Sequence, residues 1–81
     1  MNARVVAKAI RARNLVALLE LRDVDVSEAL ASVAVPPLYV VVFSLEARPG
    51  KRDHWSRTET DPEVARELYD RGVLDHVSEA P

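Results

Sequence analysis

The run from Leu38 to Glu46 constrains the fold of this chain more than any other segment. Five of its first six residues are valine or aromatic, the types that suit a pleated, half-buried surface. Pro49-Gly50 follows and is a strong turn signal. Residues 54–60 then alternate around Trp55 and are mostly polar. The sequence therefore predicts a β-hairpin made of one apolar and one polar strand.

A helix with a well-marked start is expected after the hairpin. Asp61 is a natural N-cap, Pro62 suits the first helical position, and Glu63 favours the positive end of the helix dipole. Gly72 is the expected left-handed stop. The expected buried stripe of this helix consists of Val64, Ala65, Leu68 and Tyr69.

The N-terminal half predicts two more helices. Residues 3–22 contain no glycine or proline and are rich in alanine, leucine and arginine, and their apolar side chains form two stripes at 100° per residue. A short helix is expected over residues 26–34, after a capping box formed by Asp25 and Glu28. Together these elements predict an α+β fold, a small α-α-β-β-α domain with one β-hairpin packed on helices.

Length and composition exclude several classes of protein. The 81 residues form one small domain, residues 1–81, with residues 77–81 as a frayed tail. The chain has no cysteine, which excludes disulfides, thiolate zinc sites and a cysteine nucleophile. It has two glycines, too few for a glycine-rich phosphate loop, and neither His54 nor His76 lies in a motif. We therefore expect no enzymatic activity, no catalytic residue, no cofactor and no metal site.

Charge is segregated along the chain although the net charge is only −2. Residues 1–13 carry four positive charges and no acid, and residues 48–57 carry four positive charges against Asp53 alone. These segments complement the acidic ones, within the fold or between subunits, or bind nucleic acid, or have no role. Trp55 packs across the hairpin or over the N-terminal helix in the preferred interpretation, and stacks on a base in the alternative one. The candidate nucleic-acid or partner surface consists of Arg4, Lys8, Arg11, Arg48, Lys51, Arg52, Trp55 and Arg57.

Residues 27–43 resemble the helix-turn-helix of phage Cro and repressor proteins. The residues that fall where this family places core and turn positions are Leu30-Ala31, Ala34-Val35, Pro37 and Tyr39-Val40. The resemblance implies a small DNA-binding transcriptional regulator with a recognition helix in the major groove. Leu38, Val41 and Val42 stand where that family presents polar side chains to base edges, so this function is kept as the alternative.

The expected compartment is the cytoplasm. The longest clean apolar run near the N-terminus, residues 15–19, is too short for a signal peptide or a membrane span, so no membrane contact is expected. Arginine outnumbers lysine nine to two, which is typical of GC-rich coding in an actinobacterium or its phage.

The preferred function is that of a small regulatory or adaptor protein acting through protein–protein contacts as a homodimer. The apolar strand and the two-striped N-terminal helix offer more apolar surface than a chain of this length can cover, and a two-fold dimer would cover the excess. The sequence does not identify a further protein partner, and nucleic acid is the alternative one. The expected dimer interface includes Tyr39, Val41 or Phe43 from the strand, or Val6, Ile10 and Ala17 from the helix.

Overall fold

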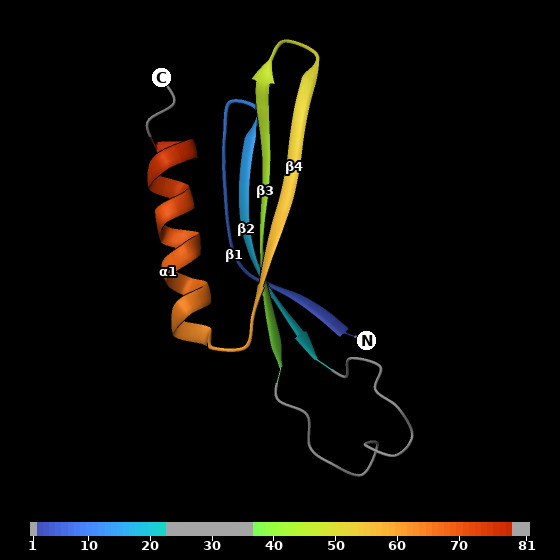
Figure 1. The fold of residues 1–81 in the computed structure, drawn as a ribbon, viewed down its shortest axis with the longest axis vertical. Helices are drawn as coiled ribbons and strands as arrows, with labels where there is room; N and C mark the ends of the chain where they lie inside the picture. Colours follow the sequence, from blue (N-terminus) through green and yellow to red (C-terminus); the bar gives the residue numbers. More distant parts are fainter. Residues whose placement is uncertain (1, 23–36, 79–81) are drawn as a thin grey trace.

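The computed structural model describes residues 2–22 and 37–78 (Figure 1). Its elements are β1 (Asn2–Arg11), β2 (Asn14–Arg22), β3 (Leu38–Arg48), β4 (Lys51–Glu59) and α1 (Pro62–Gly72). A π-helical turn, η2 (Val73–Ser78), continues α1. The strands form one antiparallel sheet in the order β1-β2-β3-β4, so each strand pairs with its neighbours in the sequence.

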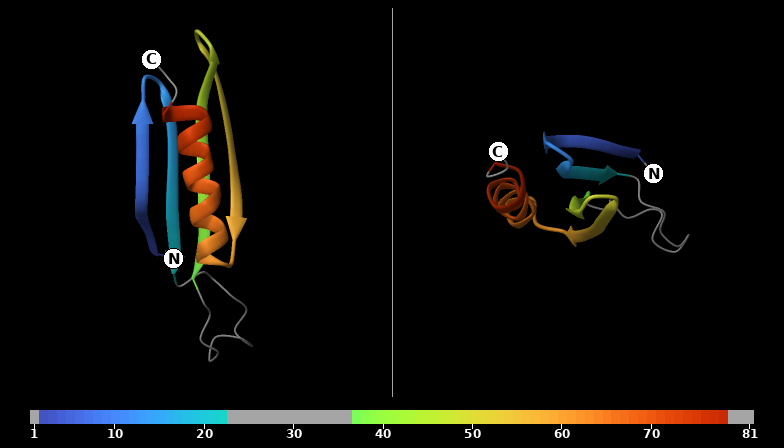
Figure 2. Two further views of the ribbon diagram at one scale, coloured as in Figure 1. Left: turned by 90° about the vertical axis from the view of Figure 1, so that its left-hand side faces the viewer. Right: turned by 90° about the horizontal axis from the view of Figure 1, so that it is seen from above.

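The described elements form two layers. Helix α1 lies along one face of the sheet, in front of β2 and β3 (Figure 2). We call this side of the sheet the helix face and the opposite side the open face, because no described element covers it. Strands β1 and β4 are the two edges of the sheet.

The register of β2 and β3 assigns their side chains to the two faces. Val16 pairs with Phe43 and Leu18 with Val41, and all four side chains are buried on the helix face. Val16 and Val41 are 0% exposed. The remaining buried members of this core come from the C-terminal helix and are Ala65, Tyr69 and Val77. Because side chains alternate along a strand, the residues between these positions point to the open face.

The α-α-β-β-α arrangement predicted from the sequence is wrong, since the described chain is β-β-β-β-α. Residues 3–22 form the hairpin β1-β2 instead of a helix, and its turn places Ala12 at φ 55°. Helix propensity is a weak preference, and pairing of β2 with the apolar strand β3 overrides it. Residues 15–19 are apolar at every position, as in a strand that places apolar side chains on both faces of a sheet, and the structure uses them in this way.

The second predicted helix, residues 26–34, lies outside the described residues. Most of the first half of the helix-turn-helix resemblance lies outside them as well. Its second half, residues 38–43, belongs to β3. The structure therefore has an extended strand where that motif requires a recognition helix.

The hairpin predicted around Pro49-Gly50 is confirmed. It consists of β3 and β4, with Gly50 in the turn at φ 78°, a conformation that favours glycine. Phe43 pairs with Trp55 across the hairpin, and Ser44 pairs with His54. Trp55 therefore lies on the helix face and His54 on the open face.

The predicted start of the C-terminal helix is also confirmed. Asp61 caps α1, and its Oδ1 accepts a hydrogen bond from the Glu63 amide at 2.9 Å. Pro62 is the first helical residue. The capping side chain therefore satisfies an amide that would otherwise lack a partner in the first turn.

The predicted left-handed stop at Gly72 is wrong, because the chain stays helical through Val73 (φ −60°, ψ −47°). A different constraint acts at Gly72. A Cβ at this position would lie 2.5 Å from Cε1 of Phe43 and 3.2 Å from Cγ1 of Val16. Glycine therefore lets the helix approach the sheet closely. Val77, assigned from the sequence to a frayed tail, is only 4% exposed.

Candidate functional site

Trp55, the only tryptophan of the chain, lies in an aromatic cluster between β4 and the C-terminal helix. Its ring stacks on Phe43 with 5.4 Å between ring centroids and 16° between ring planes. His76 of η2 meets both rings edge-on, with its centroid 5.9 Å from that of Phe43 and 6.2 Å from that of Trp55. Trp55 is nevertheless 41% exposed, so part of a well-supported indole remains accessible.

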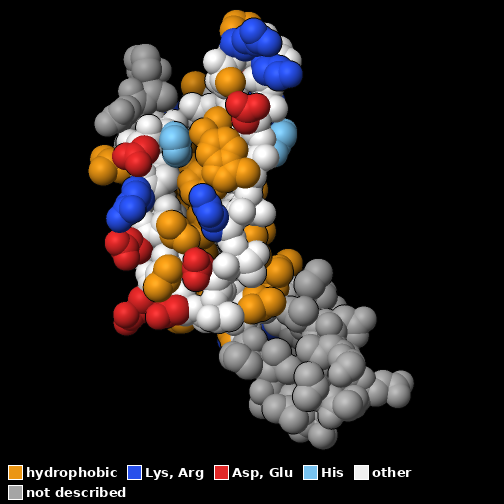
Figure 3. All heavy atoms as spheres, in the orientation of Figure 1, with side chains coloured by type: hydrophobic (Ala, Val, Ile, Leu, Met, Phe, Trp, Pro, Cys, Tyr) orange, Lys and Arg blue, Asp and Glu red, His pale blue; other side chains and the backbone are white. Residues whose placement is uncertain are grey.

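A shallow groove of about 160 Å³ lies beside Trp55. Its lining residues are Phe43, Trp55, Arg57, Leu68, Arg71, Gly72, Asp75 and His76. Small-molecule pockets usually enclose about 300–1,000 Å³, so this groove could take one ring of a ligand rather than a whole small molecule. In Figure 3, hydrophobic side chains are exposed beside the helix and cationic side chains gather at the hairpin end.

Three cations of the candidate surface lie on the hairpin that carries Trp55. Lys51 and Arg57 share the helix side of β4 with Trp55, and Arg57 lines the groove. Arg48 pairs with Lys51 at the hairpin turn. Among the described residues, none forms an ion pair or side-chain hydrogen bond with these three cations. We call Arg48, Lys51, Trp55 and Arg57 the β4 stripe.

The other candidate cations are placed elsewhere. Arg4, Lys8 and Arg11 belong to β1, the opposite edge of the sheet, and are separated from β4 by β2 and β3. Arg4 forms an ion pair with Glu20 at 3.3 Å. The structure therefore brings Lys51, Trp55 and Arg57 together on β4, with Arg48 beside them at the end of β3, and leaves the β1 cations apart.

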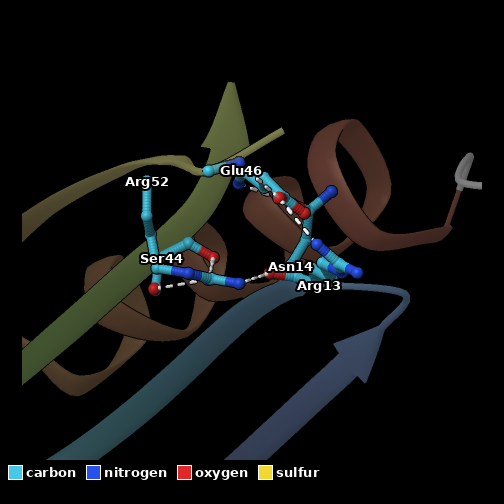
Figure 4. Close-up of polar contacts among 6 residues, drawn as sticks. Arg13, Asn14, Ser44, Glu46 and Arg52 are labelled. Carbon is cyan, nitrogen blue, oxygen red and sulfur yellow. Dashed lines mark hydrogen bonds and ion pairs between the residues drawn. The ribbon is translucent and has the colours of Figure 1, made fainter. Parts of the chain in front are cut away.

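Arg52 has a structural role at the hairpin end of the sheet (Figure 4). Its Nη1 donates to Oγ of Ser44 at 2.8 Å and to the Ser44 carbonyl oxygen at 3.2 Å. Its Nη2 donates to the carbonyl oxygen of Arg13. Arg52 thus ties the β1-β2 turn to the β3-β4 hairpin, and its donors are already engaged.

Glu46 and Asn14 complete this connection (Figure 4). Oε1 of Glu46 accepts from Nη1 of Arg13 at 3.0 Å, and the Glu46 amide donates to Oδ1 of Asn14 at 3.0 Å. Nδ2 of Asn14 donates to the carbonyl oxygen of His76 at 3.0 Å, which attaches η2 to the sheet. Desolvation opposes ionisation of Glu46, but the hydrogen bonds from Arg13 and the Gly50 amide prevail and lower the pKa of its carboxyl group.

A second carboxylate is held between two arginines near the start of β1. Glu20 lies on the helix face, is 7% exposed, and forms ion pairs with Arg22 at 2.7 Å and Arg4 at 3.3 Å. The hydrogen bond from Arg22 is the main cause that lowers the pKa of Glu20, and it outweighs the cost of desolvation. A general acid working near neutral pH needs a raised pKa, so this carboxylate is suited to a structural role.

The two histidines lie on opposite sides of the sheet. His76 contacts Phe43 and Trp55 on the helix face, whereas His54 points to the open face. Within residues 2–22 and 37–78, no group of three or more His, Cys, Asp or Glu side chains could hold a metal ion. In the same part of the chain, no helix is long and apolar enough to span a membrane.

The open face is the second candidate site. Its apolar residues on the two inner strands are Leu15, Ala17, Leu19, Leu21, Leu38, Val40 and Val42. On β1, Val5 is 55% exposed and Ile10 is 62% exposed, and both pair with residues of this face. Thus Ile10 and Ala17, two residues of the predicted dimer interface, belong to the open face, and Ala17 is itself only 6% exposed.

The other predicted interface residues lie elsewhere. Val6 lies at a register shift of β1 and is 40% exposed. Val41 and Phe43 are buried in the core under α1, and Tyr39 packs against it. Their side chains are therefore largely engaged within the chain itself.

The sequence analysis did not identify the leucines of the open face or the contact of His76 with Trp55. A signal for the leucines exists, because residues 15–21 are apolar at every position except Glu20, a continuous run that also fits a strand with apolar side chains on both faces. No local pattern reports the position of His76, since it depends on how η2 packs on the sheet.

Comparison with known proteins found no matching family model, no matching curated protein and no matching solved structure. What the chain does is therefore inferred from its two surfaces, the open face and the groove beside Trp55.

Proposed function

We propose that this chain is a small non-enzymatic regulatory or adaptor protein that acts in the cytoplasm through protein–protein contacts, as a homodimer. The observation that supports this proposal most is the apolar open face. Leu19 and Val40 pair at its centre, and neither α1 nor η2 reaches this side of the sheet. Two such faces can pack about 10 Å apart, as in a β-sandwich.

The size of the open face indicates a dimer of modest stability. Seven residues of β2 at about 3.4 Å each, and three strands at about 4.8 Å each, give an apolar footprint of roughly 24 by 14 Å. A standard protein interface buries about 800 Å² per partner. We therefore expect a dimer that dissociates on dilution.

A second copy fits this face because its apolar residues lie on β2 and β3, whereas its polar residues lie on β4 at one edge. Strand β4 contributes His54, Ser56 and Thr58 to it, next to the valines of β3. A two-fold pairing centred on β2 and β3 would bury the apolar rows and leave the β4 rows at the solvated rim. This is the arrangement of apolar core and polar rim found in protein interfaces.

Two observations support a role other than catalysis. The groove beside Trp55 is smaller than the usual substrate pocket, and the larger hollows beside Glu20 and Glu46, about 420 and 500 Å³, are lined by carboxylates that are paired with arginines. The described carboxylates with a shifted pKa, Glu20 and Glu46, are shifted downward by arginine partners, away from the range that general acid–base catalysis uses.

The test measures molar mass by light scattering over a range of protein concentrations. We expect a mass approaching twice the 9.0 kDa of the monomer at high concentration. Leu19→Lys should yield a folded monomer, because the change affects the open face and spares the core. Val64→Lys is the matched control, since Val64 is a partly exposed residue of α1 and this variant should dimerise normally. A wild-type monomer at every concentration, or a dimer that survives Leu19→Lys, would refute the proposal.

A further inference from the structure

We propose that the β4 stripe binds single-stranded nucleic acid, with an unstacked base on Trp55 and backbone phosphates on Arg57, Lys51 and Arg48. Trp55, Arg57 and Lys51 lie on the helix side of the sheet edge, away from the open face, and Arg48 lies at the hairpin end. Stacking on an aromatic side chain combined with a row of cations is the general chemistry by which proteins hold single strands.

Trp55 is held in place before any ligand arrives. Phe43 supports one side of the indole at 5.4 Å, and His76 contacts its edge. Phe43 is itself fixed by the close approach of Gly72. A base that stacks on Trp55 therefore meets a side chain whose conformational freedom is already restricted, which lowers the entropic cost of binding.

The cations of the stripe are available for phosphate, in contrast to their neighbours. Within the described chain, Arg13 and Arg71 are paired with Glu46 and Glu67, and Arg52 binds backbone and Ser44 oxygens. Lys51 and Arg57 have no such partner there and share one side of β4 with Trp55, Arg57 next to it and Lys51 beyond Asp53. Charge complementarity thus points to an anionic ligand.

The ligand must be longer than one nucleotide. Lys51 lies four residues from Trp55, about 14 Å along an extended strand, whereas Arg57 is an immediate neighbour on the same side. A single nucleotide can reach Arg57 from a stacked base, and only a longer strand reaches Lys51 and Arg48 as well. In a duplex the bases are already stacked and paired, so none is available for Trp55.

The carboxylates near the stripe limit its affinity. Asp53 shares the helix side of β4, and Asp75 lines the groove. We therefore expect a dissociation constant on the order of 10⁻⁵ M at about 50 mM salt, in the range of sequence-independent binding. Three phosphate contacts at about −0.7 each predict a slope of about −2 for log K against log salt, or about a twenty-fold loss between about 50 and 200 mM.

The test uses the intrinsic fluorescence of the protein, because Trp55 is its only tryptophan. An oligothymidylate of about twelve nucleotides should quench this fluorescence with the affinity and salt slope given above. Thymidine monophosphate should bind at least about tenfold more weakly, and a duplex of the same length should cause no comparable quenching. Equal binding of the monophosphate or of the duplex would overturn the proposal.

Variants locate the site. Arg57→Gln and Lys51→Gln change exposed side chains, and each should weaken binding about eightfold at about 50 mM salt and reduce the slope by about 0.7. Lys8→Gln is the matched control, because Lys8 is an exposed cation on β1. This variant should bind the oligonucleotide with the affinity of the wild type. The affinity of Trp55→Leu, measured by the anisotropy of a labelled oligonucleotide, should be about tenfold lower than that of the wild type.

Two results would refute the proposed binding site, whether or not the chain forms a dimer. One is the absence of quenching and of anisotropy change at oligonucleotide concentrations of about 10⁻³ M. The other is binding that Lys8→Gln weakens as much as Arg57→Gln does. The molar mass reports on the proposed homodimer separately, so failure of either proposal can be recognised without the other.

Discussion

Replacing Gly72 with alanine separates local helix propensity from the packing of this particular fold. In an exposed helix interior, alanine is more stable than glycine by about 0.5–1 kcal/mol, since glycine loses more backbone freedom on folding. Gly72 is the last residue of α1, its backbone is helical, and the chain continues into η2. Propensity alone therefore predicts that Gly72→Ala stabilises the protein.

The structure predicts that Gly72→Ala destabilises the protein. The new methyl carbon would lie 2.5 Å from Cε1 and 3.3 Å from Cζ of Phe43, closer than carbon atoms pack. The Phe43 ring has little room to move, because it stacks on Trp55 and touches His76. Overpacking of this kind costs about 1–3 kcal/mol. After the gain in helix propensity is subtracted, we expect a net loss of about 1 kcal/mol, or a fall in Tm of about 4–8 °C.

Thermal unfolding at one fixed protein concentration measures this effect, since dimerisation makes Tm depend on concentration. Phe43→Leu removes the atoms that the new methyl would meet, so Gly72→Ala should be neutral or stabilising in that background. The coupling between the two changes should amount to about 1 kcal/mol or more. A Tm that rises in the Gly72→Ala single variant, or additivity of the two changes, would refute the packing of Gly72 on Phe43.

Two further predictions concern the sheet. Val41→Pro should abolish folding, because Val41 is 0% exposed on an inner strand and proline lacks the backbone N–H that donates a hydrogen bond to the neighbouring strand. A cooperative unfolding transition in this variant would contradict the assignment of β3. The lowered pKa of Glu20 means that its ionised form stabilises the fold above its ordinary value of 4.5, and this contribution is lost as the pH falls through the folded pKa. Urea unfolding at a series of pH values should therefore show a shallower loss of stability below pH 4.5 for Glu20→Gln than for the wild type, and equal slopes would count against the ion pairs with Arg22 and Arg4.

The hairpin and α1 could be predicted because their signals are local. Pro49-Gly50 sets the turn, the valine run sets the strand, and Asp61-Pro62 sets the start of the helix. Residues 3–22 could not be predicted in the same way, because alanine, leucine and arginine favour a helix in isolation. Their strand structure depends on the pairing of Leu18 with Val41 and of Leu19 with Val40, contacts with a segment some twenty residues away along the chain.

The candidate site was predictable only in part for a similar reason. Trp55, Lys51 and Arg57 are neighbours in the sequence, and the two-residue period of a strand places them on one side of β4. Arg52 follows the same charge pattern, yet its donors bind Ser44 and the carbonyl oxygen of Arg13. Composition alone cannot distinguish an available arginine from an engaged one, because the partner comes from a turn about forty residues earlier.

The two proposed surfaces are geometrically compatible. The open face lies on one side of the sheet, and the groove beside Trp55 lies on the other, at the β4 edge between the strand and η2. Packing two open faces together would therefore leave both grooves on the outside of the dimer, each with its own Arg57 and Trp55. Two grooves on one particle would raise the effective concentration of a long strand at the second groove once the first is occupied. A weak site of the kind expected for the β4 stripe gains most from such an arrangement, which gives dimerisation through the open face a direct consequence for binding on the opposite side of the sheet.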